Sequence, residues 1–545
     1  MALSQDMYQG FEDIVGPDNV SNDPAVLQSY IYPLRAPASL PPYYGKSRPS
    51  PLAVVMPATT DEVQAIVKMC NRYKLKCKAF GTGWSSNARP LTDDCISLDL
   101  RRMNRILEID ENNMFAVVEP YVIGSQLQAE AMKVGLNCHM IGAGGSGSIL
   151  ASATSYKGEG PDSISMGYSS ENLLAAEWVM PTGDILRTGS LGSGCGWFCG
   201  EGPGPSTRGV FRGLLGAFGS LGVFTKAAIK LSPWPGPKVM PIEGVTPAYN
   251  TPLSENFKAY TLAFPSWEAF NNAIHLLYDT EIAYIGHKQF TMLGEDLSPA
   301  VVSIINNPNS TLDDLPELLE KPEIKKLQKK MRRSFQIVLA GRSRGDTEYQ
   351  QKVLDYIMAE TGGTNLPELA DPAVQKYVLL YLIKLCFKNV NYILAGGYQG
   401  TFGQYGPPDF ATQTIDVSTQ VKKKHIAKGG IVDDGGDASM GPVSAYGGGG
   451  VCGWEQFMYY DASDEASTTG ARECFLEAGQ VGLAHGFGPG RGTELDLYTP
   501  REKRQAALRS ATQPDLFHWP RKIKKAFDPG DIGDWGYLQL DEPKQ

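Results

Sequence analysis

The chain has 545 residues, 42% hydrophobic and 20% charged, a composition that indicates a globular protein and excludes disordered and collagen-like classes. Its formal net charge of −9 gives no overall attraction to nucleic acid or to an anionic membrane surface. The nine cysteines include no Cys-x-x-Cys pair, which disfavours a disulfide framework, an iron–sulfur cluster and a zinc site.

Targeting signals are also missing from the printed sequence. Its first residues show no basic region followed by an apolar stretch, and no apolar run reaches the roughly 18 residues of a membrane span. We therefore expect a cytoplasmic protein with no membrane span and no metal.

The first informative stretch in chain order is residues 51–89. Thr59 and Glu62 have the spacing of a capping box, and apolar residues then recur on one face, so the pattern predicts a helix that begins near Thr60. The sequence KCKAF at 76–80 predicts a short strand that leads directly into a loop of small and hydroxyl residues. These are Gly81, Thr82, Gly83, Trp84, Ser85 and Ser86.

Such a loop, placed after a buried strand, can turn several backbone N–H groups toward one anion, as a phosphate-binding nest does. From these residues alone, a phosphate loop and an ordinary turn both remain open.

The following region reads as strands and loops. Strands are predicted at 95–100 and 114–123, a helix at 125–134, a glycine-rich segment at 141–148 and a hairpin that turns at 182–184. Neither glycine cluster opens a helix within alternating βαβ units, so a dinucleotide fold of the GxGxxG type is disfavoured.

The pattern changes beyond Pro235. Three segments, which begin near residues 259, 335 and 455, share the order of strand, polar cap and helix, and they predict one sheet with helices on one face. Residues 312–333 are expected to be helical and 429–453 to lack regular structure. A last helix is expected to stop at Asp528-Pro529.

Six motifs in order resemble landmarks of one superfamily. They are PLAVVMPATTDEVQAIV, GTGWSSN, VVEPYVIGSQLQ, NLLAAEWVMPTGDILRTG, GVFRGLLGAFGSLGVFTKAAIKL and KIKKAFDP. The chain resembles the flavoproteins of the vanillyl-alcohol oxidase and p-cresol methylhydroxylase superfamily, with its PCMH-type FAD-binding domain. The resemblance implies an α+β fold with a two-part FAD-binding domain at 1–240 and 496–545. A cap at 241–495 would carry an antiparallel sheet covered by helices.

FAD is the cofactor that this resemblance implies. Its pyrophosphate would be held by backbone N–H groups of residues 81–86, since no Walker-type lysine or helix amino terminus is on offer. Further contacts are expected from a second loop and from the strand entry beside the ring system, where small residues allow close backbone approach. The residues implied there are Gly144, Gly145, Ser148, Ile149, Ser152, Gly222 and Val223.

Candidate catalytic residues lie near the carboxyl end. In GLAHGFGPGRG, Arg491 is similar to an arginine of the phenol-oxidising branch, whereas His485 with its following glycine is similar to the 2-hydroxyacid dehydrogenase branch. A guanidinium group fits a phenolate or a carboxylate equally well. Tyr459 and Tyr460 are candidates for holding a substrate oxygen.

His485 and His139 are also the candidates for covalent flavin attachment. The GTGWSSN loop holds no histidine or cysteine, so we expect non-covalent FAD.

The function expected from the resemblance is FAD-dependent removal of a hydride from a para-substituted phenol or related aromatic alcohol. The alternatives are a 2-hydroxyacid dehydrogenase and a flavin-carrying electron-transfer subunit of a larger complex. Expected partners are a small-molecule substrate, an electron-accepting protein, and either a second copy of the chain or the other subunits of a complex. Nucleic acid is not expected.

Overall fold

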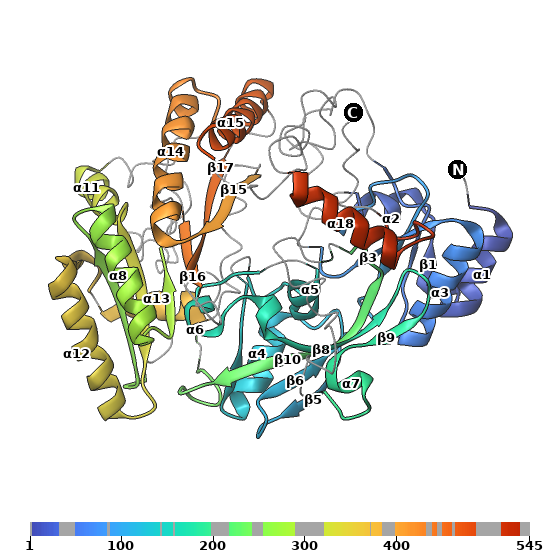
Figure 1. Ribbon diagram of the computed structural model, residues 1–545, viewed down its shortest axis with the longest axis horizontal. Coiled ribbons are helices and arrows are strands. Elements are labelled where there is room, and N and C mark those ends of the chain that lie inside the picture. The colour runs from blue at the N-terminus through green and yellow to red at the C-terminus, as the bar shows by residue number, and fades with distance from the viewer. Residues whose placement is uncertain are drawn as a thin grey trace.

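The computed structural model describes residues 3–31, 49–83, 88–141, 144–155, 158–197, 217, 219–241, 243, 254–288, 321–370, 372–383, 398–431, 439–443, 450–459, 464–486 and 514–534. Within these ranges, no helix is both long enough and apolar enough to cross a membrane. Figure 1 shows the amino-terminal layers on one side of the molecule and the helices of the cap on the other.

A small sheet opens the chain, with strand order β1-β2-β4-β3. Its strands are β1 (Val20–Ser21), β2 (Ala53–Val55), β3 (Lys76–Phe80) and β4 (Cys95–Asp99). Strands β2 and β3 both pair in parallel with β4, so β2, the helix α3 (Thr60–Tyr73) and β3 form one βαβ unit. Thr59 caps α3 as predicted, because its side chain accepts a hydrogen bond from the backbone N–H of Glu62 at 3.1 Å.

A large antiparallel sheet follows, with strand order β5-β6-β10-β8-β9 and β7 paired to β10. Its strands are β5 (Ile106–Asp110), β6 (Phe115–Val118), β7 (Leu136–Cys138), β8 (Leu173–Val179), β9 (Ile185–Arg187) and β10 (Val223–Pro233). The predicted hairpin is confirmed, since β8 and β9 pair around residues 182–184. The remaining helices of this half are α1 (Gln5–Val15), α2 (Pro24–Ser29), α4 (Gly124–Lys133), α5 (Ile149–Thr154), α6 (Ser163–Met166) and α7 (Gly189–Gly192).

The carboxyl-terminal helix α18 (Pro514–Phe527) returns to these two sheets and ends before Asp528-Pro529, as predicted. The Phe527 ring stacks on Trp178 of β8 with centroids 5.7 Å apart. Beyond the helix, Ile532 accepts a hydrogen bond from the N–H of Cys77, and the N–H of Asp534 donates to the Cys77 carbonyl. The chain end therefore adds a short parallel edge beside β3.

The cap contains two antiparallel sheets, with strand orders β12-β13-β11-β14 and β15-β17-β16. The strands are β11 (Phe257–Ala263), β12 (Ile285–His287), β13 (Ser334–Ala340), β14 (Thr364–Asn365), β15 (Tyr398–Gly406), β16 (Ser439–Val443) and β17 (Val451–Tyr459). The helices are α8 (Trp267–Thr280), α11 (Pro322–Met331), α12 (Arg344–Thr361), α13 (Pro372–Ile383), α14 (Pro408–Ala427) and α15 (Glu465–Ala484). The expected α+β fold with antiparallel cap strands and covering helices is confirmed (Figure 1).

Two expectations for the cap were wrong. The three strand-helix segments do not share one hydrogen-bonded sheet in the described residues, because β11 and β13 pair with each other while β17 pairs with β15 and β16. The stretch 429–453 also carries regular structure, since it contains β16 and the start of β17. Glycines lower strand propensity locally, but pairing on both sides of β17 overrides that propensity.

Candidate functional site

The first loop of the candidate site follows β3 directly. Gly83 has φ +74°, a left-handed conformation that favours glycine. Among the described residues, none accepts a hydrogen bond from the backbone N–H groups of residues 81–83. These N–H groups therefore have no protein partner in that part of the chain, as expected of a nest that binds an anion. Trp84, Ser85 and Ser86 lie outside the described residues.

The second loop is held against the first. The N–H of Ser148 donates to Oγ1 of Thr82 at 3.1 Å, and a Cβ placed on Gly81 would lie 3.9 Å from the Cβ of Ser148. The Ser148 hydroxyl donates to the Pro120 carbonyl at 2.5 Å and accepts from the N–H of Ala151 at 3.0 Å, which caps α5. Two segments separated by more than sixty residues thus form one surface.

The rest of the second loop is fixed by backbone contacts with the start of α4. The N–H of Ser125 donates to the Gly145 carbonyl at 2.8 Å. Ile149 is buried in the core of the large sheet, and the hydroxyl of Ser152 donates to the Ile149 carbonyl at 3.0 Å. Gly144 lies at the beginning of this loop, where its N–H donates to the Ile141 carbonyl at 3.1 Å.

The third predicted segment is the entry to β10. Gly222 has φ +95°, and a Cβ there would lie 2.3 Å from the Val179 carbonyl oxygen. Val223 is buried in the core that the small sheet shares with α3. The packing of β8 against β10 therefore already requires glycine at position 222, and a cofactor contact at these two residues stays a prediction.

Of the four candidate catalytic residues, the structure describes two. Arg491 and Tyr460 lie outside the described residues. Tyr459 is the last residue of β17 and pairs with Tyr398 of β15. His485 is exposed just after α15, and its Nδ1 donates to the Val481 carbonyl at 2.9 Å. The structure therefore does not bring these four residues together in its described part, and their catalytic roles stay predictions.

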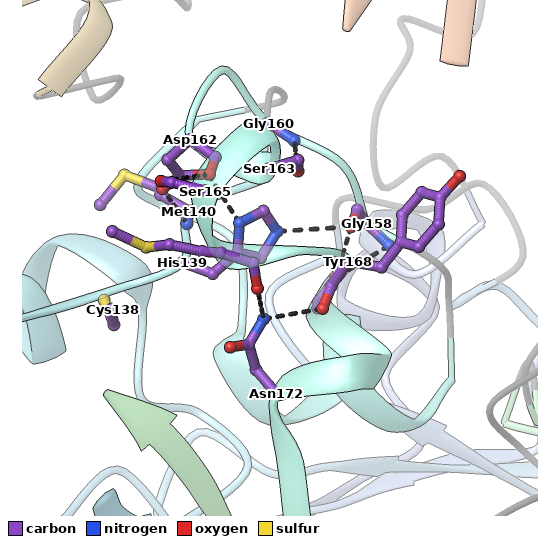
Figure 2. A network of polar contacts seen from close by, with 12 residues as sticks. Cys138, His139, Met140, Gly158, Gly160, Asp162, Ser163, Ser165, Tyr168 and Asn172 are labelled. Carbon is purple, nitrogen blue, oxygen red and sulfur yellow. Dashed lines mark hydrogen bonds and ion pairs between the residues drawn. The ribbon is translucent and has the colours of Figure 1, made fainter. Parts of the chain in front are cut away.

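A buried network around His139 was not recognised from the sequence (Figure 2). Nδ1 of His139 lies 2.6 Å from Oδ1 of Asp162, and Nε2 donates to the Gly158 carbonyl at 3.3 Å. Oδ2 of Asp162 accepts from the N–H of Met140 at 2.8 Å. Both ring nitrogens are thus engaged, so His139 and Asp162 form a clamp between the segment before the second loop and residues 158–162. Non-covalent FAD stays a prediction.

The clamp fixes a segment that also holds the cap. The Pro161 carbonyl accepts from the N–H of Gly286 in β12 at 2.8 Å, and the Ser165 hydroxyl donates to the Tyr284 carbonyl at 2.7 Å. The side chain of Ile164 is buried in the core of the cap. The second loop and the cap are therefore joined through residues 158–165. A buried histidine next to the glycine-rich segment was the only sequence signal for this junction.

A second polar cluster joins the large sheet to the start of helix α3. The buried carboxylate of Glu177 on β8 accepts from Thr60 at 2.8 Å, from Lys226 at 2.8 Å and from Arg187 at 3.0 Å. Burial acts to raise the pKa of Glu177, but hydrogen bonds from Lys226 and Thr60 outweigh it and hold the pKa below its usual value.

The chain is similar to known proteins both in sequence and in fold. A family described as FAD binding domain matches residues 51–189. An uncharacterized FAD-linked oxidoreductase of Mycobacterium tuberculosis is 28% identical over 232 residues, which cover 42% of this chain and 46% of that protein. Glycolate oxidase subunit GlcD of Bacillus subtilis is 27% identical over 43% of this chain and 47% of its own length. The chain thus spans about half the length of these relatives.

A third relative is the flavoprotein subunit of 4-cresol dehydrogenase (hydroxylating) of Pseudomonas putida, 28% identical over 36% of this chain and 37% of its own length. Among solved structures, p-cresol methylhydroxylase with substrate bound has TM-score 0.70 and 19% identity over 99% of this chain and 98% of that one. The 4-ethylphenol oxidase of Gulosibacter chungangensis has TM-score 0.69 and 16% identity over 98% and 97%.

The fold is therefore that of the PCMH-type flavoproteins, as the resemblance implied. The chain carries an FAD-binding domain at residues 51–189, and FAD is its cofactor. The geometry fits this cofactor, because the loop at 81–83 presents N–H groups without a described acceptor and the loop at 144–152 lies against it.

Proposed function

We propose that this protein is an FAD-dependent oxidoreductase that removes a hydride from a small organic substrate. The substrate class that we favour is a para-substituted phenol or a related aromatic alcohol. The observation that carries the proposal is the extent of the structural likeness. Two structures whose names refer to cresol and ethylphenol are similar over both halves of the chain, cap included. The sequence relatives cover less than half of it.

The substrate would lie between the cap and the FAD-binding half. The junction at residues 158–165 supports this arrangement, because it ties β12 of the cap to the segment that leads into the second loop. A cap fixed in this way would exclude bulk water from the space beside the cofactor and so strengthen electrostatic interactions there.

Each group of residues would have a distinct task. The loops at 81–83 and 144–152 hold and orient FAD, which when bound supplies the hydride acceptor. Arg491, as the residue similar to the arginine of the phenol branch, would stabilise the phenolate and lower the phenol pKa from its usual value of about 10. The phenolate then pushes electron density toward the para carbon, and the benzylic C–H bond breaks.

A second candidate function is oxidation of a 2-hydroxy acid. It is favoured by similarity to glycolate oxidase subunit GlcD and to a D-lactate dehydrogenase of Anaerostipes hadrus, 27% identical over 35% of this chain. In that case Arg491 would bind the carboxylate and His485 would take the hydroxyl proton. His485 is exposed in the structure, which does not favour a general base.

Steady-state turnover with an artificial electron acceptor separates the two functions. We expect turnover with para-alkylphenols or aromatic alcohols and none with 2-hydroxy acids. Turnover with hydroxy acids alone would replace the first proposal by the second. A chain that binds FAD yet reacts with neither class would point to the electron-transfer subunit.

A further inference from the structure

The inner face of the small sheet carries a buried lysine. Along β3, Cys77 and Ala79 belong to the core beneath α3, so strand alternation turns Lys78 to the opposite face. Lys78 is 1% exposed and sits in register with Ser97 of β4. On that opposite face, Lys524 of α18 and Asp534 of the returning chain end lie close enough to Lys78 to act on its charge.

The ammonium group of Lys78 has no hydrogen-bond partner in the part of the chain that the structure describes. Burial lowers its pKa, and the nearby charge of Asp534 opposes that effect only in part. Of the three other groups that act on it, Cys95 also opposes the lowering, whereas the cations Arg89 and Lys524 add to it. Lys524 is itself paired with Asp528.

Two further buried polar atoms in this region lack a described hydrogen-bond partner. They are Oγ of Ser97 and Oδ1 of Asp534. Oδ2 of Asp534 is used, since it accepts from the N–H of Leu91 at 2.6 Å. A buried, unpaired cation is costly, because burial disfavours the charged form. An anion from outside the described residues would complete the site.

The position of Lys78 points to the bound cofactor as the source of this anion. Lys78 is three residues before Gly81, where the first loop begins. Its Cε would lie 3.6 Å from a Cβ on Gly219, so the side chain extends toward the segment that enters β10. The lysine therefore lies behind the first loop and beside the third predicted segment. We propose that Lys78 is a cofactor-binding residue whose ammonium group pairs with an anionic oxygen of the FAD pyrophosphate.

This inference deepens the proposed function and rests on FAD binding, not on the identity of the substrate. It predicts opposite effects of one substitution on two forms of the protein. Without FAD, Lys78→Met removes a buried unpaired charge, so thermal unfolding should shift to higher temperature. With FAD, the same substitution removes a charge-assisted ion pair and should weaken cofactor binding.

The test uses the full chain, freed of flavin and titrated with FAD, with flavin fluorescence as the readout. We expect Lys78→Met to raise the dissociation constant of FAD roughly tenfold to a hundredfold, the worth of one charged hydrogen bond. The matched control is Lys76→Met. Lys76 is on the same strand but is paired with Asp531 at the surface, so its loss should leave FAD affinity unchanged.

Wild-type FAD affinity in Lys78→Met would overturn the inference. So would a lower unfolding temperature of its flavin-free form together with weakened FAD binding, because that combination indicates a structural lysine. If the methionine variant does not fold, Lys78→Gln takes its place with the same expected loss of affinity. A wild-type chain that binds FAD but oxidises no phenol contradicts the proposed function and leaves this pairing intact.

Discussion

The FAD-binding half and the cap differ in how the fold positions their candidate site residues. In the first half, the first cofactor loop follows β3 directly, and its contact with the second loop depends on the N–H of Ser148 and on the short side chain of Thr82. In the cap, the candidate residue Tyr459 lies on a strand that pairs with β15, some fifty residues earlier. The two cofactor loops are thus joined by a single contact between segments 66 residues apart, whereas the position of Tyr459 depends on pairing along a whole strand.

The same difference between the two halves accounts for the way in which the chain is similar to known proteins. The family match falls on residues 51–189, in the half that binds FAD, whereas two solved flavoprotein structures are similar over 98% or more of the chain, cap included. A backbone nest tolerates few changes, since glycine at φ +74° cannot be replaced without strain, while a cap sheet accepts many side chains that fit its surface. The following predictions test or sharpen this contrast.

The largest effect is expected from Gly222→Ala. Its Cβ would lie 2.3 Å from the Val179 carbonyl at φ +95°, so overpacking adds to backbone strain and should cost roughly 3 to 5 kcal/mol of stability. Gly135→Ala is the control, because φ is +77° there and nothing lies within 4 Å of the new Cβ. It should cost about 1 kcal/mol. Equal urea midpoints for the two variants would show that the backbone contact has no energetic weight.

Arg491→Met tests the proposed role of Arg491 in binding the substrate. If Arg491 stabilises an anionic substrate oxygen, its loss should leave FAD bound and lower kcat/KM about tenfold to a hundredfold, the equivalent of about 1.5 to 3 kcal/mol. For a phenol, the rise of turnover toward the phenol pKa should also move to higher pH. Arg344→Met, on the exposed face of α12, is the control. Unchanged kinetics with every active substrate would remove Arg491 from the site.

Gly83→Val tests the backbone nest. The flavin-free loop can relax away from the left-handed conformation, but the FAD-bound loop cannot, so FAD affinity should fall by about tenfold while stability changes less. Gly194→Val provides a matched control, since Gly194 also has φ +74° and open space around it. Equal flavin occupancy in both variants would mean that residues 81–83 form an ordinary turn.

The smallest effect is expected for Glu177→Gln, which breaks the cluster between the large sheet and α3. The folded pKa of Glu177 is lowered, so its charge stabilises the fold above the unfolded pKa near 4.5, and this contribution is lost as pH falls through the folded pKa. The variant should be less stable than wild type by about 1 kcal/mol at pH 7, and the difference should shrink below pH 4.5. A difference that stays constant with pH would contradict the ionic role.

Sequence reasoning succeeded where local signals decide the structure. The helix cap at Thr59, the hairpin after Val179 and the stop at Asp528 depend on neighbouring residues, and all three are confirmed. The division of the cap into two sheets was missed, because strand partners are set by contacts distant in sequence. The His139–Asp162 clamp was missed for the same reason, since the two residues are 23 positions apart and share no motif.

The most direct test of the central claim is anaerobic reduction of the bound flavin. The purified chain should be yellow, with about one FAD per chain released by acid, as expected for non-covalent binding. Addition of a para-alkylphenol without oxygen or acceptor should bleach the flavin absorbance in a single phase, because hydride passes from substrate to cofactor. Bleaching by a 2-hydroxy acid and not by any phenol, or a chain that holds no FAD, would contradict the account.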